Sequence, residues 1–287
     1  MKYLSFMVLL LLVCLWGCQK PTEVIQKKYE GKSHISYSVD PANSNNPYDS
    51  AGILHNNGLD YVIERRESIP PCDTNEYKVV LDSLLSAYNT SIQSTAPSYI
   101  NTNDPTTLQN DFWNSTRFLG PSGTMDYYSV PTAVKNPVLD ILNIVKLSLN
   151  NYSSQQVVDS IKNYETTIIN NLNLTTLQKK KILVAASVAR YSFVYWTDMI
   201  SDTSNLWFGK WFHCNNFLKN GTGFPNRILE YSDEYKAGAV VAADVVGTLA
   251  GGGCNVAAGA TYSAAVAIYC WWDDVVATVS GWFDWLF

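Results

Sequence analysis

The chain has 287 residues, a formal net charge of −5 and an isoelectric point near 5.2, so it carries no basic field of the kind that holds nucleic acid. Charged residues make up 16% of the chain, below the quarter or so that is typical, and Asn, Ser, Thr and Tyr provide a neutral, hydrogen-bonding surface instead. The length allows one large domain or two smaller ones with a buried core.

The N-terminal residues form an apolar run, 3–15, that has the length of a signal peptide and is short for a membrane span of about 20 residues. The run ends in "LWGC" at residues 15–18. This stretch resembles the lipobox of bacterial lipoproteins, in which a branched apolar residue and a small residue precede an obligatory cysteine; Trp16 departs from the small residue usual at its position. The resemblance implies a signal peptide at 1–17, cleavage before Cys18, and acylation of Cys18 with fatty acids such as palmitate. An uncleaved N-terminal anchor helix is the alternative.

Residues 18–48 are polar, contain Pro and Asn and show little periodicity, so we expect a flexible tether. A lipid anchor implies a place in the cell envelope, and the outer membrane is the expected location; the sequence leaves open whether the protein faces the periplasm or the cell surface. The expected partners are the membrane, through the N-terminal lipid anchor, and another envelope protein. Nucleic acid is not an expected partner.

A mainly α, irregular multi-helix domain is predicted for residues 49–235. The stretch "NPYDSAGILHNNGLDYVIERRE" at 46–67 opens with an Asn-Pro breaker, offers Asp49 or Ser50 as a helix N-cap, and has an apolar side. Because prolines recur between residues 97 and 131, we expect most of that region to form loops. Further helices are expected at 75–92, near 106–117, at 137–150 with Pro137 in the first helical position, at 153–172 after the capping-box pattern "SSQQ", and at 175–201.

The layout "NPYD…G…HN.GLDYV", which starts at Asn46, resembles the opening of uncharacterised lipoproteins from the Bacteroidota. The resemblance covers about 16 residues of this chain. It agrees with the lipoprotein assignment and implies no particular activity.

The C-terminal segment, residues 236–287, is rich in Gly, Ala and Trp, and Asp244 is the only charged residue in the stretch 237–272. A Gly-Gly-Gly break divides the stretch into 237–250 and 254–272, which predicts a helical hairpin whose small side chains let the two helices approach closely. We expect the hairpin to pack on the main domain. Two other interpretations stay open: a hairpin that inserts into or lies on a membrane, and a β-rich or aggregating tail.

Four cysteines remain once the signal peptide and the acylated cysteine are set aside: Cys72, Cys214, Cys254 and Cys270. An even number in an exported chain is compatible with two disulfides, and three pairings are open. A Cys254–Cys270 bridge would staple the hairpin, and a Cys72–Cys214 bridge would join its base. Buried free thiols are the alternative. The sequence has no C-x-x-C motif, which argues against a zinc site or a thioredoxin-like site.

The sequence contains no H-E-x-x-H, G-x-S-x-G or P-loop motif, and we assign no catalytic, cofactor-binding or metal-binding residue. His55 is expected to be a hydrogen-bonding structural histidine. The favoured function is therefore a binding or scaffolding role for a lipid-anchored envelope protein, and a catalytic role is the less favoured interpretation. The alternatives are a membrane-active or toxin-like protein that acts through its C-terminal segment, and an envelope hydrolase whose site is spread over loops.

Overall fold

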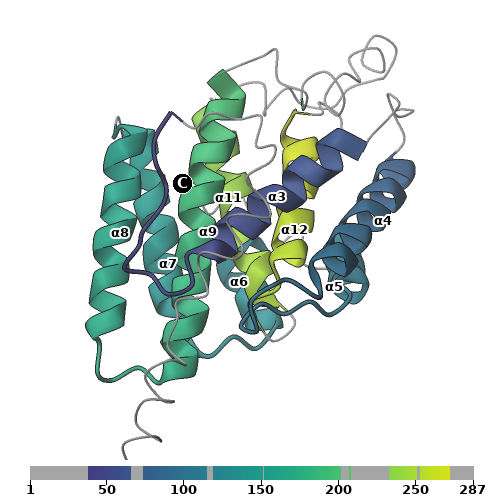
Figure 1. Cartoon of the computed structure of the whole chain (residues 1–287). Helices are drawn as coiled ribbons and strands as arrows, with labels where there is room; N and C mark the ends of the chain where they lie inside the picture. Colours follow the sequence, from purple (N-terminus) through teal and green to yellow (C-terminus); the bar gives the residue numbers. More distant parts are fainter. Residues whose placement is uncertain are drawn as a thin grey trace, which may run out of the picture. The chain divides into compact units, whose positions relative to one another are not determined.

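The structure is a computed structural model that describes residues 38–65, 74–114, 119–150, 152–201, 207, 233–250 and 253–271. These residues form helices and turns and no strand, which confirms the predicted mainly α, multi-helix fold (Figure 1). The elements are α3 (Ser50–Arg65), α4 (Thr74–Ile92), α5 (Thr106–Asn114), α6 (Gly120–Tyr127), α7 (Thr132–Lys146), the 3₁₀ turn η2 (Leu147–Asn150), α8 (Ser154–Asn170), α9 (Thr176–Ser201), α11 (Asp233–Leu249) and α12 (Val256–Trp271).

Helix α9 forms the centre of the core. Between Ile182 and Trp196 its residues are nearly all apolar or small, with Arg190 as the one charged exception. Every residue of this stretch is buried, as expected of a helix that is surrounded by others. Its main neighbours are α11, α3, α7 and α8, and Figure 1 shows α3 crossing α9 obliquely while α7 and α8 run alongside it. Polar groups on α9 therefore lie where several helices meet.

The Gly/Ala-rich segment folds as the predicted hairpin, made of α11 and α12. Gly253 and Cys254 form the turn, with positive φ angles of 91° and 64°. Residues 237–250 and 253–264 are all buried, so this part of the hairpin is core and is not a β-rich tail. Across the described ranges, no helix combines the length and the apolar character needed to cross a membrane. The Trp-rich residues 272–287 lie outside the described residues.

Two predictions that depended on proline differ from the structure. Pro121 predicts a loop, whereas α6 holds Pro121 in its first turn, where the missing N–H costs no helical hydrogen bond. Pro137 predicts a helix start, whereas α7 begins at Thr132 and contains Pro137 in its interior, because burial of its apolar face outweighs the lost bond. The capping box of α8 is confirmed, since Ser153 and Gln156 each accept a hydrogen bond from the other's backbone N–H.

Residues 38–49 pack against the helices, so residues 38–48, which the prediction placed in the flexible tether of 18–48, are held by the domain. We call residues 38–49 the N-terminal strap. At its start, the backbone N–H of Ser38 donates to Asp198 Oδ2 at 2.8 Å and the Ser38 hydroxyl donates to Asp198 Oδ1 at 2.5 Å, close to the C-terminal end of α9. The signal peptide, Cys18 and the rest of the predicted tether lie outside the described residues.

Candidate functional site

Two buried polar networks are the strongest candidates for a functional site in the described part of the chain. One lies where the strap meets α8 and α9, and we call it the strap network. The other lies where α3 meets α9 and α11, and we call it the His55 network. Helix α9 presents Ser187 and Arg190, one turn apart, to the strap network, and Ser192 and Trp196, also one turn apart, to the His55 network.

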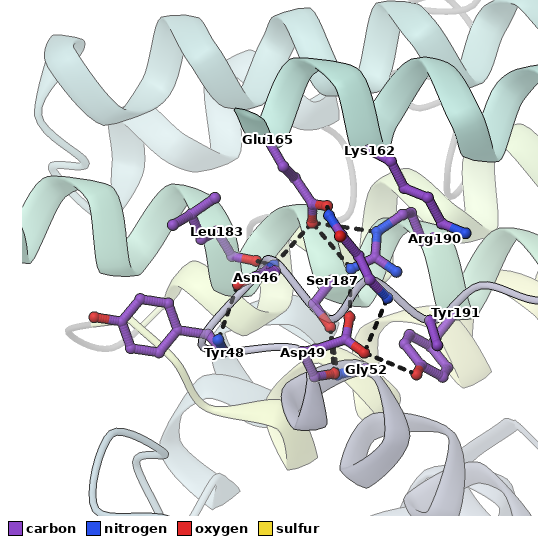
Figure 2. A network of polar contacts seen from close by, with 12 residues as sticks. Asn46, Tyr48, Asp49, Gly52, Lys162, Glu165, Leu183, Ser187, Arg190 and Tyr191 are labelled. Carbon is purple, nitrogen blue, oxygen red and sulfur yellow. Dashed lines mark hydrogen bonds and ion pairs between the residues drawn. The ribbon is translucent and has the colours of Figure 1, made fainter. Parts of the chain in front are cut away.

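The strap network is centred on Glu165, a fully buried carboxylate on α8 (Figure 2). Its Oε1 accepts a hydrogen bond from Asn46 Nδ2 at 2.8 Å, and its Oε2 accepts one from Asn43 Nδ2 at 2.5 Å. Asn46 Nδ2 also donates to the backbone carbonyl of Leu183 on α9 at 2.9 Å. Two amides of the strap are thus held by one carboxylate, and both amides are themselves buried.

Arg190 connects Glu165 to the end of the strap at Asp49. Its Nη2 lies 3.0 Å from Glu165 Oε1 and 2.5 Å from Asp49 Oδ1, and its Nε donates to Glu165 Oε1 at 3.2 Å. The second carboxylate oxygen of Asp49, Oδ2, accepts a hydrogen bond from the Tyr191 hydroxyl at 3.1 Å. The backbone carbonyl of Asp49 accepts one from the Ser187 hydroxyl at 2.7 Å. Asp49 therefore has both its side chain and its backbone fixed by α9.

Burial governs the electrostatics of the strap network. It raises the pKa of Glu165, and Arg190 and the two asparagines oppose that rise. Burial acts to lower the pKa of Arg190, but the carboxylates of Glu165 and Asp49 outweigh it, so that the pKa of Arg190 is raised. One guanidinium group therefore balances two carboxylates that come from different parts of the chain. Removal of Arg190 would leave the buried Glu165 without its counterion, which is strongly destabilising.

In the His55 network, His55 and Asp244 form a fully buried ion pair, with His55 Nε2 at 2.6 Å from Asp244 Oδ1. His55 Nδ1 lies 2.9 Å from the side-chain oxygen of Asn56. The second carboxylate oxygen of Asp244 accepts from Trp196 Nε1 at 3.1 Å and from the Ser192 hydroxyl. Asp244, the only charged residue in the stretch 237–272, thus has its hydrogen-bonding side-chain partners on α3 and α9.

Burial acts to lower the pKa of His55, but the Asp244 carboxylate outweighs it and the net shift is upward. The ion pair contributes stability below the ordinary pKa of histidine, and this contribution is lost as the pH rises through the raised value. Ser192 donates to Asp244 and not to His55, so the group lacks the contact between nucleophile and base that catalysis requires. This geometry agrees with the predicted structural role of His55.

An open polar pocket of about 290 Å³ lies between α4 and the turn before α5. Asn89 fixes its wall, because its Nδ2 donates to the backbone carbonyls of Thr102 at 2.7 Å and Asn103 at 3.0 Å. The lining groups are amides, hydroxyls and one carboxylate, which suit a neutral hydrogen-bonding ligand. They are Ser86, Asn89, Thr90, Gln93, Thr102, Asn103 and Asp104. Within the described ranges, no three His, Cys, Asp or Glu side chains gather closely enough to hold a metal ion.

The predicted cysteine sites fall only in part on the described residues. Cys254 is a free, buried thiol. It precedes α12, whereas Cys270 lies in the last turn of that helix, so a rise of 1.5 Å per residue separates them by about 20 Å. A disulfide needs Cα atoms within about 7 Å, so the Cys254–Cys270 pairing does not fit this structure. Cys18, Cys72 and Cys214 lie outside the described residues.

The sequence motif that starts at Asn46 supplies much of both networks, although we assigned it no structural role beyond its helix. Two of its polar residues, Asn46 and Asp49, belong to the strap network. Two others, His55 and Asn56, belong to the His55 network. Asn56 also joins the two, since its Nδ2 donates to the backbone carbonyl of Tyr191 at 2.9 Å. The available signal was the run of one His and two Asn at 55–57, between apolar residues of the predicted helix. Nothing in the sequence pointed to Glu165 or Arg190.

Comparisons of the chain with protein families, with curated proteins and with solved structures found no match. The function is therefore inferred from the sequence and the geometry. The geometry comprises two enclosed polar networks that fix the strap and the hairpin, together with one open polar pocket.

Proposed function

We propose that the protein is a lipid-anchored component of the bacterial cell envelope, acylated at Cys18, whose helical domain has a binding or scaffolding role. The observation that carries this proposal is the lipobox-like stretch at 15–18, directly after the apolar run 3–15. Each methylene of an acyl chain adds about 0.8 kcal/mol of membrane affinity, and two or more chains hold a protein stably at the membrane. The outer membrane is the location we propose.

The strap supports the proposal because it joins the chain after Cys18 to the core of the domain. About 20 residues separate Cys18 from Ser38, and this length of chain reaches at most about 70 Å. From Ser38 on, the chain is held by Asp198, and then by the buried Glu165 and Arg190. A domain attached in this way stays near the membrane, and a pull on the tether acts on a segment that is hydrogen-bonded to α8 and α9.

The polar pocket between α4 and α5 supports the binding role. Its wall is rigid, because Asn89 and Asn255 both donate to the backbone carbonyl of Asn103, at 3.0 Å and 3.2 Å. Amide and hydroxyl groups on such a wall favour a partner that offers hydrogen-bonding groups without strong charge. The partner we propose is another envelope protein, in agreement with the neutral, Asn- and Thr-rich surface of the chain.

Mass spectrometry of the protein purified from a membrane fraction tests the anchor. We expect the N-terminal peptide to begin at Cys18 and to carry the added mass of acyl chains. Cys18→Ala should abolish that peptide, whereas Cys14→Ala, a matched change within the signal peptide, should leave it unaltered. An N-terminus at Met1, or a mature protein without acyl mass, would refute the proposed function.

A further inference from the structure

Exposed leucines gather at the turn between α8 and α9. Leu172 is 95% exposed and Leu177 is 57% exposed, the one within the turn and the other in the first turn of α9. Single exposed apolar side chains are common on protein surfaces. Leu172 and Leu177 lie five positions apart at one tip, and the hydrophobic effect favours covering such exposed side chains with an apolar surface. Figure 1 shows this turn projecting at the lower left of the view.

The same tip is locally cationic in a chain whose net charge is negative. From residue 166 to residue 197 the sequence contains no Asp or Glu, whereas it contains Lys179, Lys180 and Lys181, which begin two positions after Leu177. Lys179 is engaged, since its Nζ donates to the backbone carbonyl of Ile169 at 2.7 Å. Across the described ranges, Lys180 and Lys181 form no ion pair.

The positive potential of these lysines extends to the neighbouring hairpin turn. The side chain of Lys181 lies against Gly253, where a Cβ atom would come within 3.1 Å of Lys181 Cε. Burial raises the pKa of the Cys254 thiol, and the charges of Lys180 and Lys181 oppose that rise. Lys180 and Lys181, which have no carboxylate partner among the described residues, follow Leu177 by three and four positions, the spacing at which side chains on a helix are neighbours.

Exposed apolar side chains next to lysines form the combination that enters the headgroup region of an anionic membrane. A tip of two leucines is too small for a standard protein interface, which covers about 800 Å² on each partner. We propose that Leu172, Leu177, Lys180 and Lys181 form a second contact with the membrane, one that orients the domain. The inference rests on the proposed lipid anchor, which supplies the attachment and brings the tip close to the lipid.

The length of the chain allows both contacts to form together. The strap begins beside Asp198, near the C-terminal end of α9, whereas the leucines lie at its N-terminal end. A helix of 26 residues is about 39 Å long. The segment between Cys18 and Ser38 reaches up to about 70 Å, so a tether that leaves one end of α9 still lets the other end touch the membrane.

Hydrogen–deuterium exchange of the lipidated full chain in vesicles tests the contact. Vesicles of phosphatidylcholine with about a third phosphatidylglycerol are compared with vesicles of phosphatidylcholine alone, since anionic headgroups attract nearby lysines. We expect exchange over residues 170–178 to be at least about fivefold slower on the anionic vesicles. The double variant Leu172→Asn/Leu177→Asn should lose this protection, whereas Val79→Asn, which replaces a 65% exposed apolar residue on α4, should retain it.

Vesicle flotation in the same samples separates the two proposals. Equal exchange on both kinds of vesicle, while the protein still floats with them, would overturn the tip contact and leave the lipid anchor intact. A protein that does not float would refute the anchor and the contact that depends on it. Protection that appears in native envelope vesicles but not in pure lipid would also overturn the inference, because it would assign the tip to a protein partner.

Discussion

Gly259 of α12 lies so close to α11 that even Gly259→Ala should destabilise the fold. A Cβ atom at this position would lie 2.2 Å from Thr248 Oγ1, 2.7 Å from the backbone carbonyl oxygen of Asp244 and 3.3 Å from His55 Cδ2. The Thr248 hydroxyl cannot turn away freely, because it donates to that same carbonyl at 2.8 Å. The Asp244 carbonyl is part of a helix, so it can move only if the two helices separate.

The expected cost follows from these contacts. Adding a methyl group to a filled core costs about 1–3 kcal/mol, and a clash with backbone places Gly259→Ala at the upper end of this range. Loss of the Thr248 hydrogen bond adds about 1 kcal/mol, and the better helix propensity of alanine returns about 1 kcal/mol. We therefore expect the unfolding free energy to fall by about 3 kcal/mol. For a domain of this size, the melting temperature should drop by about 6–12 °C.

Thermal unfolding followed by far-ultraviolet circular dichroism measures the effect, with Gly123→Ala as the matched control. A Cβ atom at Gly123 would lie 3.1 Å from Leu119 Cβ, and the next nearest atom would be Leu119 Cγ at 3.9 Å, so a shift of a few tenths of an ångström at this partly exposed site relieves the contact. The control should melt at the wild-type temperature or slightly above it, since alanine favours the helix. If Gly259→Ala melts within about 2 °C of the wild type, the close approach of α11 and α12 does not hold the hairpin in the core.

Three further predictions concern the cap of α8, the strap network and the largely buried Asp60. Ser153→Ala removes the capping box of α8, and a urea titration should show a loss of about 1 kcal/mol; an unchanged midpoint would argue against the cap. Arg190→Met leaves Glu165 buried without its counterion, so we expect a loss of about 3–5 kcal/mol and early proteolytic cleavage in the strap, and a protected strap would contradict the network. Burial raises the pKa of Asp60 from 3.8 to about 7, so Asp60 loses its proton at a lower pH in the unfolded chain than in the folded protein. The unfolding free energy should therefore fall as the pH rises from about 4 to 7. Asp60→Asn should flatten that pH dependence, and an identical profile would refute the assignment.

Most helices could be predicted because their signals are local. The capping box of α8, the long apolar run of α9 and the glycine break between α11 and α12 each lie within a few residues of the feature they specify. The prolines show the limit of such signals. Pro137 lies inside α7 and Pro121 lies inside α6, because packing of the apolar faces decided where these helices begin.

The networks could not be predicted because their members are distant in sequence. Asn43 and Glu165 are 122 residues apart, and His55 and Asp244 are 189 residues apart. One member of the second pair, Asp244, nonetheless stands out in the sequence. Asp244 is the only charged residue in a long Gly/Ala-rich stretch, and a buried carboxylate needs a donor. The sequence establishes that requirement, but it does not indicate that His55 on α3 is the residue that meets it.

The His55 network has a consequence for how the core is specified. Small side chains are frequent on α11 and α12, and two glycines already tie the packing of these helices to one register. A Cβ atom at Gly247 would lie 2.8 Å from Tyr262 Cγ, and one at Gly259 would lie 2.2 Å from Thr248 Oγ1. A buried ion pair adds little net stability compared with apolar residues of the same size, but it is costly to break. If α11 slid by one turn, the Asp244 carboxylate would lose His55, Ser192 and Trp196 together. We infer that the Asp244 carboxylate sets the register of α11 against α3 and α9, while the close contacts at Gly247 and Gly259 set the register of α11 against α12.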